Sequence, residues 1–290
     1  MIIFAERRDF SMSIVTLLSD WGLADHYVAA VKGRLYCEWP DVRIVDISHQ
    51  IPKYNDTVAA YVLKQAYPYF PPGTVHCICV NDIATPKRPH IVVYEGGQYF
   101  IGADNGIFPK LFDHKPMQAW RIMLKSDSET ATFPSLNLFP MAAVHIAQGG
   151  DPSEIGEPYD WQGQNFNQKF NEAYIAEDYG ENGLQVGARI IGKVIYTDSY
   201  GNGVTNIGRS MFEKVLAEFP HFKIRLRSYD AHRSKQPLNR ISRAYGEVPE
   251  ADLCALFLDN QLLEISLNRA SATQLINLKL QAPVTIHFKA

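Results

Sequence analysis

The sequence predicts an α/β N-terminal domain with a mainly parallel sheet, followed by a smaller C-terminal all-β domain that resembles a barrel. Strand-like apolar runs alternate with helical patterns through the first half, which is typical of a covered parallel sheet. From about Asn171 the apolar runs become short and are separated by turns. The 290 residues also exceed the usual size of one domain. We expect domains over residues 13–160 and 181–290, joined by a polar linker over 161–180.

The elements of the first half follow from the spacing of apolar residues. Short apolar runs predict strands at 14–18, 42–47 and 74–80. Apolar residues at helical spacing predict helices at 25–36, 57–66 and 139–147. The turn Glu95-Gly96-Gly97 predicts a hairpin that pairs 90–94 with 98–101. In the second half, strands are expected at 188–196, 222–226, 262–267 and 284–288.

Composition describes an ordinary globular protein and indicates neither nucleic acid nor a membrane as partner. The net charge is only −3, and no apolar stretch approaches the ~20 residues of a membrane helix. The four cysteines lack the Cys-x-x-Cys spacing, so we expect reduced thiols rather than a metal site, in a cytoplasmic protein. Residues 1–12 lack the apolar core of a signal peptide. Either Met1 or Met12 is the expected start of the chain.

Two distant segments share an unusual pattern. In Leu18-Ser19-Asp20-Trp21-Gly22 and in Thr197-Asp198-Ser199-Tyr200-Gly201-Asn202, an apolar run ends in an acid, an aromatic residue and a glycine. Glycine lets the backbone turn where a Cβ would obstruct it. A carboxylate beside a ring suits a nucleoside, because the acid can hold ribose hydroxyls while the ring stacks on a base. One such segment alone would favour a strand followed by an Asp-Gly turn.

Further pieces make the chain resemble the S-adenosyl-L-methionine (SAM) hydrolase family, or SAM hydroxide adenosyltransferases, which includes the fluorinase and chlorinase. The resemblance runs from about Ser13 to Phe288. In order, the matching pieces are Ser19-Asp20-Trp21-Gly22, Val45-Asp46-Ile47-Ser48-His49, Tyr69-Phe70-Pro71-Pro72-Gly73-Thr74-Val75, Gly102-Ala103-Asp104-Asn105-Gly106, Asp198 to Asn202 with Thr205-Asn206-Ile207, and Leu263-Glu264-Ile265 with Asn268-Arg269-Ala270. Their order and spacing indicate the fold and an adenosyl ligand.

The resemblance implies ligand contacts in the first domain. Asp20 would accept hydrogen bonds from the ribose hydroxyls, Tyr54 would line the ribose and sulfonium, and Phe133 would form a pocket wall. For Tyr54 a half-buried packing role remains open. Asp104-Asn105-Gly106 is better explained as a tight turn.

The resemblance also implies contacts in the second domain. Asp198 would bind the methionine ammonium, and Tyr200 and Asn202 would face the adenine. Backbone groups around Leu267 and Arg269 would pair with the adenine edge. Family members bind SAM between the α/β domain of one subunit and the barrel of the next, which implies a homotrimer here. SAM would be the substrate or ligand, with no further cofactor.

The family's chemistry is an in-line displacement at C5′ of the ribose, with methionine as leaving group. In the hydrolases an Asp, an Arg and a His surround the attacking water, whereas the halogenases hold a halide in a desolvated pocket. By spacing, Asn81 stands in the place of the Asp and Pro134 in that of the His, while Arg88 keeps the Arg. Ser135 matches a fluorinase serine, and Asp82 comes one residue late. The predicted catalytic residues are therefore Arg88, Asn81 and Ser135.

Three functions are compatible with these residues. The first is hydrolysis of SAM to adenosine and methionine, because orientation and desolvation of water supply much of the rate even without a base. The second is a non-catalytic protein that binds SAM or another adenosyl compound. The third is a halide-dependent adenosyltransferase, which Ser135 and the missing Asp and His favour. A Rossmann-type methyltransferase is disfavoured, because no Gly-rich loop follows the first strand.

Overall fold

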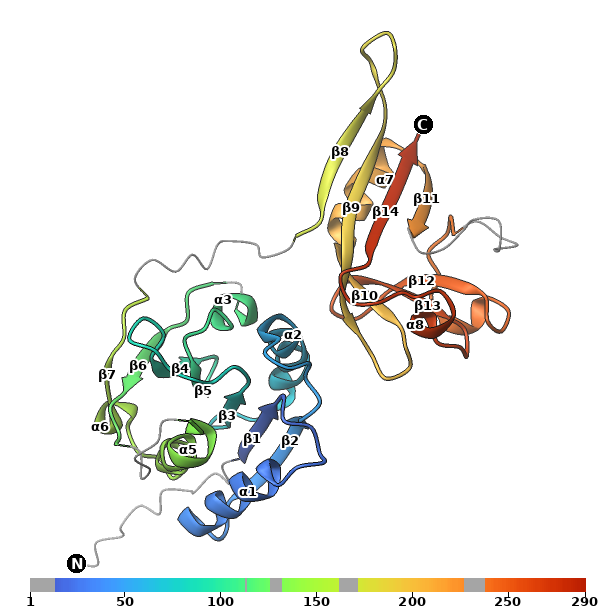
Figure 1. Ribbon diagram of the computed structural model, residues 1–290. Coiled ribbons are helices and arrows are strands. Elements are labelled where there is room, and N and C mark those ends of the chain that lie inside the picture. The colour runs from blue at the N-terminus through green and yellow to red at the C-terminus, as the bar shows by residue number, and fades with distance from the viewer. Residues whose placement is uncertain (1–13, 113, 126–131, 162–171, 227–237) are drawn as a thin grey trace, which may run out of the picture. The chain divides into compact units, whose positions relative to one another are not determined.

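The computed structural model describes residues 14–112, 114–125, 132–161, 172–226 and 238–290. The chain divides into two compact units, residues 1–168 and 169–290, each with its own hydrophobic core (Figure 1). Met12 and residues 162–171 of the predicted linker lie outside the described residues. The rest of that linker is not irregular, because its residues form strand β8, Tyr174–Tyr179.

A seven-stranded mixed sheet forms the centre of the N-terminal unit, in the order β2-β1-β3-β5-β4-β6-β7. The first four strands are parallel: β2 Arg43–Ser48, β1 Ile14–Ser19, β3 Val75–Cys79 and β5 Gln98–Ala103. The antiparallel remainder comprises β4 His90–Glu95, β6 Gln118–Ile122 and β7 Gly156–Pro158. The prediction of an α/β domain is thus confirmed. The antiparallel edge was missed beyond the β4–β5 hairpin, because β6 and β7 are short and lack a continuous apolar run.

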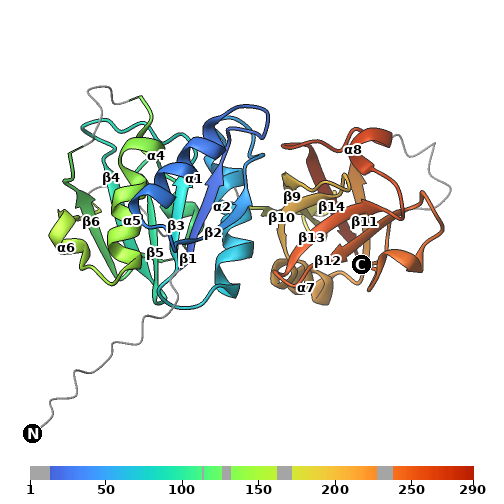
Figure 2. The same cartoon turned by 90° about the horizontal axis from the view of Figure 1, so that it is seen from below.

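Helices cover both faces of this sheet (Figure 2). Helices α1, Tyr27–Glu38, and α5, Phe139–Ala147, pack on each other over one face, with the short α4, Pro134–Asn137, beside them. The other face carries α2, Asp56–Ala66, with the short η1 and α3, Tyr67–Tyr69 and Phe108–Leu111. Helix α2 begins where its cap residue Asn55 accepts a hydrogen bond from Val58 N at 3.0 Å. Helix α6, Pro152–Ile155, precedes β7.

Alternation along the central strands sends side chains to the two faces in turn. Val15 and Leu17 of β1, together with Cys77 and Cys79 of β3, belong to the buried core cluster that includes α1 and α5 residues. Cys77 and Cys79 are free thiols, and burial raises the pKa of Cys77 to about 12. These two cysteines therefore act as small apolar core residues, as the sequence predicts.

A buried polar chain crosses the opposite face of the sheet. Thr16 Oγ1 lies 2.8 Å from His76 Nδ1, and His76 Nε2 lies 2.8 Å from Gln98 Oε1. Because an amide oxygen can only accept, Nε2 carries the proton and Nδ1 accepts from the threonine. The ring of His76 also stacks on Phe100 with centroids 4.8 Å apart. Burial lowers the pKa of His76 from 6.5 to about 4, so this histidine is neutral in the folded protein.

Replacement of His76 by Gln should flatten the dependence of stability on pH. The folded pKa near 4 lies below the unfolded value of 6.5, so the unfolded chain binds more protons between them. Stability from neutral His76 is therefore fully present above pH 6.5 and is lost as the pH falls towards 4, by about 3 kcal/mol in all. Denaturant unfolding at several pH values should show this loss in the wild type and not in His76→Gln. The exposed His221→Gln serves as control and should retain the wild-type slope; parallel curves for all three proteins would contradict the prediction.

The C-terminal unit is a curled antiparallel sheet of seven strands. Its order is β11-β14-β9-β10-β13-β12, and β8 pairs with the first half of β9. The bounds are β9 Gln185–Thr197, β10 Gly203–Gly208, β11 His221–Leu226, β12 Leu253–Phe257, β13 Leu262–Leu267 and β14 Pro283–Lys289. The all-β prediction needs one correction, since helices α7, Arg209–Glu218, and α8, Ala272–Leu275, and the turn η2, Tyr245–Glu247, also belong to this unit. Phe212 and Val215 of α7 are buried at helical spacing and anchor it on the core.

Candidate functional site

Parallel pairing places the carboxyl ends of β1 and β3 side by side. The two strands are in register from Val15 opposite Val75 to Ser19 opposite Cys79. Asp20 therefore leaves the sheet next to the loop that begins with Val80 and Asn81. Ligands of open α/β sheets bind at this edge, because loops from neighbouring strands diverge there.

Asp20 is held rigidly at this edge. Its side chain is buried, and Oδ2 accepts a hydrogen bond from Tyr54 N at 2.8 Å. Tyr54 has a left-handed backbone, with φ 58°, and its ring is 72% exposed. The structure thus brings Tyr54 to Asp20 through its backbone, and the exposure of the ring argues against the packing role.

An aromatic cluster adjoins Asp20. The ring of Trp21 meets Phe133 edge-on, with centroids 5.4 Å apart, and Phe133 meets Tyr27 edge-on at 5.5 Å. His49 stacks on Trp21 at 6.2 Å. Phe133, the predicted pocket wall, lies in this cluster, half-buried and directly before α4. The cluster provides an apolar surface next to a carboxylate, which is the combination that the sequence predicts.

Ser19, His49 and Asp46 form a relay that resembles a hydrolytic triad. Ser19 Oγ lies 2.7 Å from His49 Nδ1, and His49 Nε2 lies 3.1 Å from Asp46 Oδ1. Burial alone would raise the pKa of Asp46, but hydrogen bonds from Lys32 and His49 outweigh it and lower that pKa. Ser19 is fully buried within the sheet, so its hydroxyl cannot reach a substrate. The relay instead fixes the end of β2 against the end of β1, as does the bond from Gly22 N to His49 O at 2.6 Å.

The loop after β3 carries a second carboxylate into the same region. Ser135, fully buried in α4, donates its hydroxyl to Asp82 Oδ2. Asn81 has a left-handed backbone, with φ 49°, and its carbonyl accepts a hydrogen bond from Asn105 Nδ2 at 2.9 Å. Burial raises the pKa of Asp82, against the Ser135 hydrogen bond, and the charge of Asp20 contributes in the same direction. The predicted residues Asn81 and Ser135 thus lie next to the carboxylate of Asp82, which was not among the predicted catalytic residues because it comes one position late in the sequence.

Three further residues that the sequence singles out in this region are Pro134, Asn105 and Arg88. Pro134 occupies the first turn of α4 and is buried, where a missing N–H costs nothing. Asn105 lies in the predicted turn and supports the β3–β4 loop. Arg88 ends a tight turn, in which Thr85 and Arg88 exchange two backbone hydrogen bonds of 3.0 and 2.9 Å. Its side chain is exposed.

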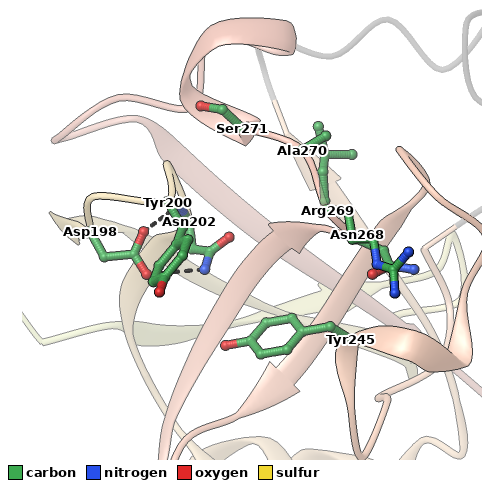
Figure 3. Close-up of a pocket in the computed structure, with 9 residues that line it drawn as sticks. Asp198, Tyr200, Asn202, Tyr245, Asn268, Arg269, Ala270 and Ser271 are labelled. Atoms are coloured by element: carbon green, nitrogen blue, oxygen red, sulfur yellow. Dashed lines mark hydrogen bonds between the residues drawn. The ribbon is translucent and has the colours of Figure 1, made fainter.

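The C-terminal unit contains a pocket of about 690 Å³ (Figure 3). Its lining includes all five residues predicted for this domain: Asp198, Tyr200, Asn202, Leu267 and Arg269. The loop after β9 supplies the first three. Leu267 ends β13, and the loop that follows supplies Arg269 with Asn268, Ala270 and Ser271. This volume is within the range of small-molecule sites.

Asp198 and Asn202 close the first loop on itself. Asp198 Oδ1 accepts from Asn202 N at 2.8 Å and Oδ2 from Asn202 Nδ2 at 3.0 Å. Gly201 has φ 85° and packs so closely that a Cβ there would lie 2.0 Å from Ser271 Oγ. Its carbonyl accepts from the N–H and the hydroxyl of Thr273, at 3.0 and 2.9 Å. The glycine is therefore required both by its conformation and by contact with the facing loop.

Tyr245 completes the pocket, and no sequence pattern points to it because it lies outside any predicted element. Its hydroxyl donates to Glu264 Oε1 at 3.0 Å, and Ser266 Oγ donates to the same oxygen at 2.5 Å. Burial raises the pKa of Glu264, although both hydrogen bonds oppose the shift. In Figure 3 the Tyr245 ring lies opposite Asp198 and Asn202. Its position in η2 is thus fixed from β13.

The described ranges of the chain contain neither a metal-binding cluster nor a membrane-spanning helix. There, no group of three or more His, Cys, Asp or Glu side chains is placed to hold a metal ion. Among the same residues, no helix combines the length and apolar character needed to cross a membrane. The candidate site therefore consists of carboxylates, amides, hydroxyls and aromatic rings.

Substitution of Gly201 by Ala should disturb the C-terminal pocket. The left-handed backbone costs about 1–2 kcal/mol for a residue with a Cβ, and the contact with Ser271 adds to this. Thermal unfolding should shift to lower temperature, and titration calorimetry should show weaker adenosine binding. Gly33→Ala is the matched control, because Gly33 is exposed in α1 with open space around it and should gain about 0.5–1 kcal/mol. Unchanged stability and binding in Gly201→Ala would contradict this account of the loop.

Known proteins match the chain over both units. The family descriptions "SAM hydroxide adenosyltransferase N-terminal domain" and "C-terminal domain" match residues 15–156 and 192–285. A relative from Methanocaldococcus jannaschii named (R)-S-adenosyl-L-methionine hydrolase is 28% identical over 283 residues, 93% of this chain and 94% of the relative. A relative of the same name from Thermus thermophilus is 29% identical over 288 residues, which cover 95% of this chain and 100% of the relative. A fluorinase from Nocardia brasiliensis is 23% identical over 295 residues, which cover 92% of this chain and 94% of the fluorinase.

A solved structure shows the same fold. It is described as an uncharacterized conserved protein from Thermotoga maritima, and it superposes with a TM-score of 0.76 at 24% identity, covering 94% of this chain and 99% of that one. The two family matches include both carboxylate-bearing loops, those of Asp20 and Asp198. The chain belongs to the SAM hydroxide adenosyltransferase family.

Proposed function

We propose that this protein hydrolyses SAM to adenosine and L-methionine by attack of water at C5′. The observation that carries the proposal is the match to relatives named SAM hydrolases over 93–95% of this chain. Two sites of suitable chemistry support it, one in each unit, each with a buried or hydrogen-bonded carboxylate beside aromatic rings. Because both relatives are named for the (R) form, the sulfonium configuration of the substrate is part of the proposal.

The reaction balances without a cofactor. As the bond from water oxygen to C5′ forms, the C5′–S bond breaks, and sulfur keeps the electron pair to become a neutral thioether. The oxygen loses one proton, which gives the 5′-hydroxyl of adenosine. Because methionine leaves as a neutral molecule, it needs neither a proton nor a Lewis acid. The protein has to orient water opposite the sulfonium and exclude bulk solvent.

We assign the ligand groups to the two sites as follows. Asp20 accepts hydrogen bonds from the ribose hydroxyls, with Tyr54 and Phe133 lining the ribose and sulfonium. In the C-terminal pocket Asp198 holds the methionine ammonium. The adenine is faced by Tyr200 and Asn202 and paired at its edge by backbone groups of Leu267 and Arg269. Arg88, Asn81 and Ser135 stay candidates for orienting the water.

We further propose that three copies assemble and that each SAM site combines the first domain of one copy with the second domain of the next. Each unit supplies only part of the groups that a SAM molecule needs, which supports this arrangement. The four free thiols support a reducing compartment, the cytoplasm. The rings of Tyr54 and Tyr200 are 72% and 79% exposed. An interface between copies would bury them against an apolar surface.

A halide-dependent reaction is less well supported. The hydroxyl of Ser135, which matches a fluorinase serine, is engaged by the carboxylate of Asp82. A negative charge at that position repels a halide in a site of low dielectric constant. Binding without catalysis is the stronger alternative, since Asn81 and Pro134 lack groups that transfer a proton.

Incubation with each sulfonium epimer of SAM, with and without chloride, should separate the three functions by chromatography of the products. We expect adenosine and methionine, in amounts that chloride does not change and that survive treatment with a chelator. Chlorinated adenosine would establish the halide reaction, and unchanged SAM that nevertheless binds in calorimetry would establish a binding protein. Asp20→Ala and Asp198→Ala should each weaken SAM binding about ten-fold or more, since hydrogen bonds to charged groups contribute roughly 1.5–3 kcal/mol.

Co-expression of Asp20→Ala with Asp198→Ala should restore activity if sites form between copies. Each variant alone lacks one required carboxylate in every site. In random mixed rings, about a quarter of the sites would combine a native first domain with a native second domain, so about a quarter of wild-type activity should return. Sedimentation should give the mass of a trimer. Mixed assemblies with no more activity than either variant would place both carboxylates of a site in one chain.

A further inference from the structure

The loop that connects β3 and β4 places a carboxylate where alignment by spacing predicts an amide. Resting on the proposed hydrolysis, we infer that Asp82, rather than Asn81, is the catalytic carboxylate that contacts the attacking water. Counting from Arg88 puts Asn81 in the position of the family Asp. The backbone conformation of Asn81, however, turns the side chain of Asp82, rather than that of Asn81, towards Ser135 and Asp20.

The left-handed conformation of Asn81 re-aims the chain. Successive residues of an extended chain point to opposite sides, so a one-residue shift would normally turn the carboxylate away. A residue with φ 49° interrupts that alternation, and Asn adopts this region more readily than most residues. Asn105 Nδ2 bonds the carbonyls of Val80 and Asn81, at 3.2 and 2.9 Å, and so holds the turn.

The Asp82 backbone is held from a second side. His90 Nε2 lies 2.7 Å from the Asp82 carbonyl, and because a carbonyl can only accept, Nε2 carries the proton. The His90 ring packs edge-on against Phe139 of α5, with centroids 5.2 Å apart. Asp82 is thus held to β4 through its carbonyl and to α4 through its carboxylate. This rigidity is what an oriented water requires.

The carboxylate of Asp82 has the surroundings of a base. Its Oδ2 accepts the hydroxyl of the fully buried Ser135, whose α4 directly follows the aromatic wall residue Phe133. The titratable groups coupled to its charge are His90 of β4, Asp20 after β1 and the buried thiol of Cys79 in β3. Burial raises the pKa of Asp82, which makes the carboxylate a stronger base than an exposed one. As C5′ takes the water oxygen, one water proton passes to this carboxylate and from there to solvent.

Asp82→Asn tests the inference, because it keeps the shape and the acceptor for Ser135 but removes the base. We expect kcat for SAM hydrolysis to fall roughly 10²–10⁴-fold, while the dissociation constant for SAM changes less than about three-fold. The wild-type kcat should decline as the pH falls through the raised pKa of Asp82, and the residual activity of the variant should lack that decline. Asp178→Asn, which removes a half-buried carboxylate paired with Arg189 at 2.8 Å in the other unit, is the matched control and should keep full activity.

Asn81→Asp distinguishes the two positions. If Asn81 occupied the family position, a carboxylate there would raise activity and would rescue Asp82→Asn; our inference expects neither. Circular dichroism and thermal unfolding would establish that each variant folds. If Asp82→Asn does not fold, Asp82→Glu, which keeps the charge but moves the carboxylate, takes its place in the kcat measurement. An active wild type with unaltered kcat in Asp82→Asn would overturn the role of Asp82 while leaving the proposed hydrolysis intact. A wild type that forms no adenosine would instead overturn the proposed function.

Discussion

The parallel register of β1 with β3 is the constraint on which the N-terminal site depends. It sets Ser19 beside Cys79 and so brings the residues after each strand, Asp20 and the Asn81–Asp82 pair, to one edge of the sheet. Parallel strands require helical connections, and α1 and α2 provide them while covering opposite faces. A slip of one residue would exchange the side chains that β1 presents to the two covered faces and move Asp20 away from Tyr54. The packing of the core thus fixes the geometry of the site.

Both units hold their carboxylates by the same device. Asp20 accepts the backbone N–H of Tyr54, and Asp198 accepts that of Asn202, each within a loop that contains a left-handed residue. Such turns aim N–H groups inward, where they stabilise an anion. A carboxylate already fixed loses little conformational freedom when a ligand binds, which favours affinity. The strained backbones at Tyr54 and Asn81 are consistent with sites where structure serves binding rather than stability.

Much of this arrangement could be predicted from the sequence, and the failures have physical causes. Helix 139–147 and the β4–β5 hairpin were predictable because their apolar period and turn residues are local signals. Strand β8 was not predicted because it is an edge strand whose residues are mostly exposed on both faces. Asp82 was set aside because counting along the sequence assumes a regular backbone, which the φ of Asn81 does not satisfy. Tyr245 depends on a partner nineteen residues away, Glu264, and no local pattern reports such contacts.

If the nucleoside binds beside Asp20 as proposed, the two carboxylates there affect both substrate choice and product release. Asp20 and Asp82 are close enough for the charge of one to raise the pKa of the other, so the region is electronegative when both are ionised. In the proposed complex the sulfonium cation of SAM would lie in this field, whereas adenosine is neutral. The same field that attracts the substrate therefore does not retain the nucleoside product. On the proposed assignment it would also disfavour an incoming halide, so electrostatics rather than a dedicated histidine would favour water as the nucleophile.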